Sequence, residues 1–184
     1  IAQMKSAPSC DICGQTMNAE VPTKAPPSRF RIRASAAIVR DGKILLVEYD
    51  DDLNGYHFNL PGGGVKPGES VLAAVRREVR EETAAEVDVG PLLLAWEFRP
   101  DWTDTNLPNI HVIGLVFRCA LRDGSEPRLP PQPDLYQTGV RWVPLSDLPG
   151  VPLLPHIAGQ LIEALESPVL FDRFVVEPWP PVEH

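Results

Sequence analysis

Three glutamates lie close together in one short segment of the sequence, at positions 78, 81 and 82. Spacings of three and four residues place Glu78, Glu81 and Glu82 on one face of a helix. Like charges so close together destabilise a helix unless cations lie among them. Carboxylate oxygens are the hard ligands that Mg²⁺ and Mn²⁺ prefer in proteins. The spacing therefore predicts a divalent-metal site, and the alternative is an ordinary solvated helix face.

Three consecutive glycines, Gly62, Gly63 and Gly64, precede the acidic segment. A glycine backbone lacks Cβ and can come close to an ion or a phosphate. We therefore expect residues 61–64 to form a loop in which one carbonyl oxygen adds a metal ligand. Arg77 lies four residues before Glu81, and we expect this pairing to orient the carboxylate, because an exposed helical ion pair adds only about 0.2–0.5 kcal/mol.

A helix must present these carboxylates, and residues 70–83 have the pattern for one. This segment contains strong helix formers and no proline or glycine. Its apolar residues Leu72, Val75 and Val79 recur at helical spacing. We expect this stripe to pack in the core, so that the carboxylates beside it border a cleft.

The rest of the chain alternates between strand-like and helical patterns. Residues 34–40 and 43–49 predict a hairpin around Asp41-Gly42. A second helix is expected at residues 154–166. Interleaved strands and helices favour an α/β or α+β fold with a mixed sheet. Further strands are expected at residues 57–60, 86–89, 92–98, 110–121, 140–144 and 171–176.

The composition fits one globular domain, because 184 residues with 43% apolar side chains can bury a sizeable core. We expect a flexible arm at residues 1–28, a catalytic domain at residues 29–167 and a tail at residues 168–184. The net charge of −8 argues against nucleic-acid polymers as partners. An acidic protein that acts on an anionic phosphate would need a bridging cation.

The location and the cysteines give further expectations. No apolar run approaches the length of a membrane span and no signal pattern is evident, so we expect a cytoplasmic protein without membrane contact. Three cysteines fit a reducing compartment. Zinc at Cys10 and Cys13 is not expected, because a structural zinc site needs four ligands and no second pair has suitable spacing.

The glycine and glutamate segment resembles the catalytic box of the Nudix hydrolase family, G-x5-E-x7-R-E-U-x-E-E-x-G-U, where U is apolar. The late glycine of the box is Ala84 here, and such a replacement can change how the chain leaves the helix, because a left-handed residue there disfavours Cβ. The matching residues are Gly63, Glu69, Arg77, Glu78, Val79, Glu81 and Glu82.

The resemblance implies a mixed β-sheet sandwiched between helices, with the box forming loop, helix and loop. It also implies metal-dependent hydrolysis of the diphosphate bond in a nucleoside diphosphate derivative. The substrate would be small, of the ADP-ribose or nucleoside triphosphate type. Family members often pair, so a homodimer is one expectation. A non-catalytic nucleotide-binding or regulatory module is the alternative, which a missing metal glutamate would favour.

By the same resemblance, Glu78, Glu81 and Glu82 would bind Mg²⁺, or Mn²⁺, together with the carbonyl of Gly63. Glu69 and Arg77 would brace the helix. The first candidate for the base that takes a proton from water is Glu78. Family members also use a glutamate outside the box, and the loop at residues 126–139 offers Glu126 and Asp134 as alternatives.

Substrate contacts are less sharply marked by the sequence. Arg31 and Arg33 either meet a phosphate or merely flank the first strand. Trp96, with Phe98 and Trp102, either stacks on a base or packs in the core, and Glu97 beside it is a further candidate contact. Pro100 lies where a proline is associated with ADP-ribose cleavage in the family, which puts ADP-ribose slightly ahead of nucleoside triphosphates. His111 is expected to be structural.

Overall fold

The computed structural model describes residues 29–99, 110–166 and 174–177. Several sequence predictions fall outside these segments. They concern the arm at residues 1–28, Cys10 and Cys13, Pro100, Trp102 and most of the tail at residues 168–184.

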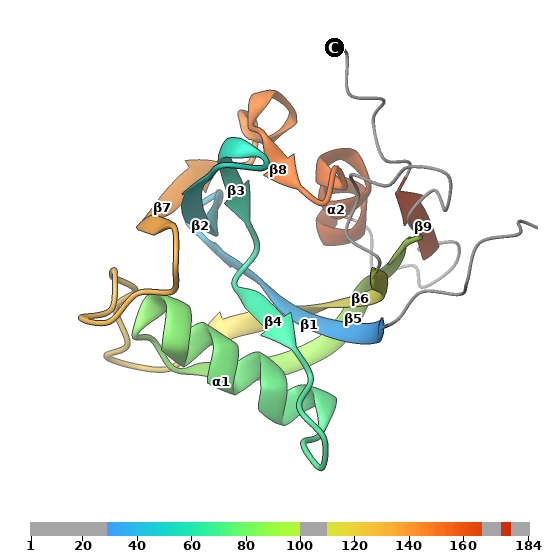
Figure 1. Ribbon diagram of the computed structural model, residues 1–184. Helices are drawn as coiled ribbons and strands as arrows, with labels where there is room; N and C mark the ends of the chain where they lie inside the picture. The colour runs from blue at the N-terminus through green and yellow to red at the C-terminus, as the bar shows by residue number, and fades with distance from the viewer. Residues whose placement is uncertain (1–28, 100–109, 167–173, 178–184) are drawn as a thin grey trace, which may run out of the picture.

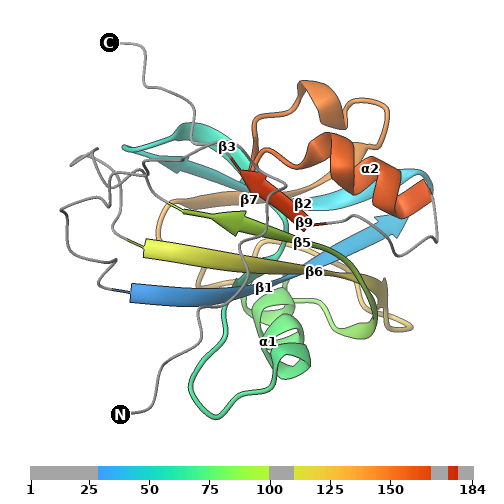
Figure 2. The same ribbon diagram turned by 90° about the vertical axis from the view of Figure 1, so that its right-hand side faces the viewer.

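The described residues form a curled mixed sheet with one helix on either side (Figures 1 and 2). The strands follow one another in the order β8-β3-β2-β1-β6-β5-β9, while β4 pairs with β1 and β7 pairs with β2. The pairs β1–β6, β3–β8 and β5–β9 are parallel and the others are antiparallel. The strands are β1 (Arg29–Arg40), β2 (Lys43–Asp51), β3 (Gly55–Asn59), β4 (Gly62–Gly64), β5 (Val87–Phe98), β6 (Ile110–Leu121), β7 (Gln137–Pro144), β8 (Leu153–Leu154) and β9 (Phe174–Glu177).

The predicted hairpin joins β1 to β2. Asp41 and Gly42 both have positive φ, of 51° and 71°, as a two-residue hairpin turn requires. Strand β1 changes partners along its length: its first part pairs with β4 and β6, and its end pairs with β2. This one long strand therefore connects the two halves of the sheet.

The glycine segment is a strand, so the prediction of a loop at residues 61–64 was wrong. Strand β4 pairs with β1, with Gly62 opposite Ser35 and Gly64 opposite Arg33. A Cβ on Gly62 would lie 2.5 Å from the Ser35 Cα. Because no real Cβ comes so close, only glycine permits this pairing.

Other boundaries also differ from the predictions. Helix α2 (Ala158–Glu166) begins later than residue 154, because Leu154 pairs with β3 and precedes Pro155, which disfavours helical backbone at that position. The short helix η1 (Leu148–Gly150) lies before it. The two runs predicted at residues 86–89 and 92–98 form one strand, β5, with irregular pairing between them. None of the helices in the described segments is long and apolar enough to cross a membrane.

Helix α1 (Val71–Thr83) packs on the face of the sheet opposite to α2 (Figure 2). Its core residues are Ala74, Val75 and Val79. Leu72, which was predicted to be buried, is 41% exposed. The helix is turned so that Glu78 and Glu82, rather than Leu72, face inward.

Local signals fix both ends of α1. The Ser70 hydroxyl oxygen accepts a hydrogen bond from the Ala73 N–H at 3.2 Å and caps the start. At the other end Ala84 takes the left-handed conformation, with φ 52° and ψ 20°. Its N–H donates to the Arg80 carbonyl at 3.0 Å. The helix therefore ends as a glycine would end it, with the strain of an added Cβ.

Candidate active site

Glu82 is buried, and two hydrogen bonds hold its carboxylate in place. The residue is 3% exposed, and its carboxylate accepts hydrogen bonds of 2.7 Å from the Tyr49 hydroxyl and from the Gly62 N–H. Burial raises the pKa of Glu82 to about 7, although the charge of Arg33 and these two hydrogen bonds act in the opposite direction. Burial and the neighbouring Glu82 charge raise the pKa of Tyr49, so this hydroxyl stays protonated and donates. A cation close to this carboxylate would therefore stabilise the ionised form of Glu82.

Glu78 lies one turn earlier, pressed against the middle glycine of β4. It is 8% exposed, and a Cβ on Gly63 would lie 2.4 Å from its carboxyl carbon. Any side chain at Gly63 would thus displace the carboxylate. The bare backbone of β4 therefore lets two buried carboxylates, Glu78 and Glu82, lie side by side along it.

Arg77 connects the remaining charged residues of the box. Its guanidinium donates to both oxygens of Glu69, at 2.8 and 2.9 Å, and to the Gly64 carbonyl at 3.1 Å. Its Nη1 also donates to Glu78 at 2.7 Å and to Glu81 at 2.9 Å. Arg77 holds the pKa of Glu69 at about 2, helped by a hydrogen bond from the Lys66 N–H. This network fixes α1 against β4 and the segment that follows it.

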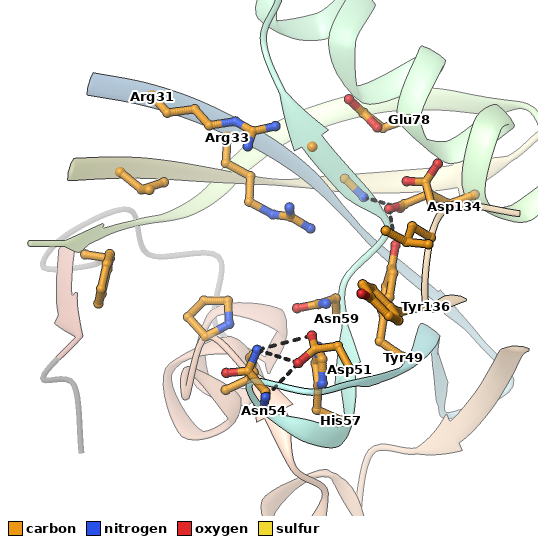
Figure 3. A pocket seen from close by; sticks show the side chains of 18 of the residues that line it. Arg31, Arg33, Tyr49, Asp51, Asn54, His57, Asn59, Glu78, Asp134 and Tyr136 are labelled. Atoms are coloured by element: carbon orange, nitrogen blue, oxygen red, sulfur yellow. Dashed lines mark hydrogen bonds and ion pairs between the residues drawn. The ribbon is translucent and has the colours of Figure 1, made fainter. Parts of the chain in front are cut away.

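A cavity of about 690 Å³ opens beside these residues. Figure 3 shows Glu78 and Asp134 at one side of it, Arg31 and Arg33 at another, and Asp51 with His57 at the far end. The lining contains both acidic and basic side chains, so it suits an anionic substrate that is bridged by a cation. The acidic and basic residues among its lining are Arg31, Arg33, Asp51, His57, Lys66, Arg77, Glu78, Glu81, Glu82 and Asp134.

The structure brings three of the four predicted substrate contacts to this cavity. Arg31, Arg33 and Trp96 line it, although Trp96 is only 5% exposed and packs against Gly114. Glu97 is not among the lining residues, and its carboxylate lies 2.7 Å from the His111 ring. Successive side chains of β5 point to opposite faces, which separates Trp96 from Glu97.

The two alternative bases are also separated by the structure. Asp134 lines the cavity near Glu78 (Figure 3). Glu126 lies outside the lining and forms a two-pronged ion pair with Arg40, with both contacts at 3.0 Å. Glu78 and Asp134 therefore stay as candidates for the base, whereas Glu126 is engaged elsewhere.

Two residues that sequence reasoning missed hold the site together. Tyr49 lies near the end of β2 and had no distinguishing pattern in the sequence. Gln137, which is 6% exposed, donates from its side-chain amide to the Glu82 carbonyl at 2.7 Å. The one sequence signal that could have marked it is a glutamine directly after a polar loop, where a strand begins.

The acidic residues fit a divalent metal by their chemistry. As the side chains stand, no three acidic, histidine or cysteine side chains of the described segments converge on one point. The Arg77 guanidinium contacts both Glu78 and Glu81. Carboxylate oxygens and backbone carbonyl oxygens are nevertheless the kinds of ligand that Mg²⁺ and Mn²⁺ prefer. Buried carboxylates are costly unless a cation neutralises them.

The mixed sheet, the buried carboxylates and the arginines of the cavity lining together define an α+β protein whose site suits a phosphate compound. Residues 29–165 match the family model of the NUDIX domain. The nucleoside triphosphatase NudI of Salmonella agona (strain SL483) is 37% identical over 101 residues, which are 50% of this chain and 69% of that protein. The chain therefore belongs to the Nudix hydrolase family, and the expected class of enzyme, a hydrolase acting on phosphoric anhydrides, is confirmed.

Solved structures agree with this assignment. The MutT NUDIX hydrolase from Burkholderia pseudomallei is 31% identical with a TM-score of 0.60, and the match covers 74% of this chain and 98% of that one. An ADP-ribose pyrophosphatase from Streptococcus suis 89-1591 is 28% identical with a TM-score of 0.55, over 78% of this chain and 98% of the other. The predicted fold class is thereby confirmed.

Proposed function

We propose that this chain hydrolyses the diphosphate bond of a small nucleotide with the help of Mg²⁺ or Mn²⁺. One observation carries the proposal: Glu78 and Glu82 lie buried side by side against β4, at a cavity that also contains Arg31 and Arg33. Two buried carboxylates destabilise a fold unless a cation compensates their negative charges. The same cation would also bind an anionic substrate that the two arginines hold.

The metal would be held by Glu78, Glu81 and Glu82, with the Gly63 carbonyl as a further oxygen ligand. When bound, it would neutralise the diphosphate and lower the pKa of a coordinated water. The Glu69–Arg77 pair keeps α1 in place against β4. Tyr49 and the Gly62 N–H hold the Glu82 carboxylate in one orientation.

The arginines and the base complete the reaction. Arg31 and Arg33 bind phosphate oxygens, because guanidinium groups match phosphate geometry well. Glu78 is the first candidate to take the proton of the attacking water. Its Oε1 accepts a hydrogen bond from Arg77, which leaves Oε2 to accept the proton. Asp134 is the second candidate.

The substrate is a nucleoside diphosphate derivative, with two classes to be tested first. The name of the 37% identical relative concerns nucleoside triphosphates, and that of the Streptococcus suis structure concerns ADP-ribose. Both substrates carry a diphosphate linked to a nucleoside. A cavity of about 690 Å³ lies within the range of about 300–1,000 Å³ that is usual for small-molecule sites.

A substrate screen tests the proposal. ADP-ribose, nucleoside triphosphates, dinucleoside polyphosphates and nucleotide sugars are incubated with the protein and Mg²⁺, Mn²⁺ or EDTA, and the products are separated by chromatography. We expect metal-dependent cleavage between two phosphorus atoms in at least one class, and none with EDTA. Nucleotide binding without cleavage of any substrate would refute hydrolysis and favour a non-catalytic module.

A further inference from the structure

Tyr136 has an unusual backbone conformation beside the cavity. It is one of three non-glycine residues in the described segments with positive φ, here 67°. It occupies the third position of a turn that the Gln137 N–H closes by donating to the Asp134 carbonyl at 3.0 Å. Positive φ at this position favours glycine or asparagine, and for a bulky side chain it is strained. Strain of this kind often marks a residue whose side chain has a functional role.

The ring of Tyr136 is presented to the cavity and not to the core. Tyr136 lines the cavity and is 48% exposed. Within the described part of the chain its side chain has no hydrogen bond and no aromatic partner. Leu53 and Leu135, which are 62% and 78% exposed, line the same cavity. In Figure 3 Tyr136 lies across the view from Arg31 and Arg33.

Two hydrogen bonds fix the backbone of this turn. The Asp50 N–H donates to the Tyr136 carbonyl at 3.0 Å, which ties the turn to the end of β2. The buried side-chain amide of Gln137 donates to the Glu82 carbonyl at 2.7 Å, which ties it to the last turn of α1. The position of the Tyr136 backbone relative to the carboxylates is therefore fixed by these two contacts.

We propose that Tyr136 is the platform on which the nucleobase of the substrate stacks, with Gln137 as the residue that positions it. The inference rests on the proposed function and narrows its substrates to diphosphates that carry an aromatic base. A flat ring with an unpartnered face can stack on any of the nucleobases, because every base has a flat aromatic face. The exposed Leu53 and Leu135 would exclude water from the edge of the stacked pair.

Two variants separate the ring from the strain of its backbone. Tyr136→Phe keeps the ring, whereas Tyr136→Gly removes the ring and relieves the positive φ. Tyr56→Ala is the matched control, because Tyr56 is 47% exposed and is not among the cavity-lining residues. The ligands are a non-hydrolysable α,β-methylene nucleoside triphosphate and inorganic tripolyphosphate, which lacks a base. Both are titrated calorimetrically in the presence of Mg²⁺.

We expect Tyr136→Gly to weaken nucleotide binding by about tenfold to a hundredfold, as the loss of one base–aromatic stack does. Tyr136→Phe and Tyr56→Ala should bind the nucleotide as the wild type does. Tripolyphosphate should bind all four proteins alike. The thermal midpoint of Tyr136→Gly should not fall, which separates loss of the ring from loss of the fold.

Unchanged nucleotide affinity in Tyr136→Gly would overturn the inference. An equal loss of tripolyphosphate affinity would also overturn it, because the base would then not be the group that is recognised. Steady-state hydrolysis of the cleavable nucleotide distinguishes this failure from failure of the proposed function. Cleavage with an unaltered KM in Tyr136→Gly refutes the platform alone, whereas Tyr136-dependent binding without cleavage refutes hydrolysis alone. Absence of nucleotide binding by the wild type overturns both.

Discussion

Replacing Glu82 by glutamine tests whether the buried charge of this residue destabilises the metal-free protein. Glu82 is 3% exposed, and its pKa is about 7 instead of the ordinary 4.5. The folded protein therefore holds this proton more tightly than the unfolded chain does. Stability is undiminished below pH 4.5 and falls as the pH rises toward 7. Glutamine keeps the shape and can still pair with Tyr49 and the Gly62 N–H.

The size of the effect follows from the pKa values. A rise in pKa from 4.5 to about 7 lowers the free energy of unfolding by roughly 3 kcal/mol at pH 8. For a chain of this size, each kcal/mol shifts the thermal midpoint by about 2–4 °C. We therefore expect metal-free Glu82→Gln to unfold about 6–12 °C higher than the wild type at pH 8. The difference should shrink to near zero at pH 4.5.

Thermal unfolding followed by circular dichroism in EDTA, between pH 4.5 and 8, measures this difference. Glu163→Gln is the matched control, because Glu163 is exposed on α2. This control should follow the wild type at every pH. Added Mg²⁺ should stabilise the wild type more than Glu82→Gln, because it binds the ionised carboxylate. A difference between Glu82→Gln and wild type that does not depend on pH would refute the reasoning.

Three further predictions concern the end of α1, the Glu69–Arg77 pair and the segment before β1. Ala84→Gly should raise the free energy of unfolding by about 1 kcal/mol in urea titrations, because it relieves the left-handed strain; a destabilised variant would contradict this. Arg77→Lys should reduce turnover by about tenfold to a hundredfold in initial-rate assays, since lysine cannot pair with both oxygens of Glu69. Full activity would show that charge alone suffices. Removal of residues 1–28 should leave initial rates unchanged, because no box residue lies there, and lost activity would assign the arm a part in the site.

The helix α1 could be predicted from the sequence because its signals are local. The cap at Ser70, the helix formers and the spacing of the glutamates all lie within one short segment. Strand β4 could not be predicted, since three glycines favour a strand only where another backbone approaches them closely. That contact comes from β1, some thirty residues earlier in the chain, at Ser35. The residues around β4 therefore give no signal of this pairing.

The residues of the site likewise divide into those predictable from local spacing and those that depend on long-range contacts. Matching the box by spacing identified Arg77 and Glu69, which the structure joins through two hydrogen bonds. Tyr49 and Gln137 reach Glu82 only through the register of β2 and through the turn before β7. These contacts depend on how distant segments pack. Glu97 was predicted as a substrate contact together with Trp96, but the alternation of side chains along β5 places it outside the cavity lining.

The most direct measurement of the central claim is the turnover of Glu82→Gln and Glu78→Gln with saturating Mg²⁺, on the substrate that the wild type cleaves. Both variants should keep the fold and lose at least about a hundredfold in kcat, because metal clamping contributes several kcal/mol to the transition state. Glu163→Gln should retain the wild-type rate. Unchanged Mg²⁺-dependent turnover in folded Glu82→Gln would contradict the assignment of the acidic helix as the metal site.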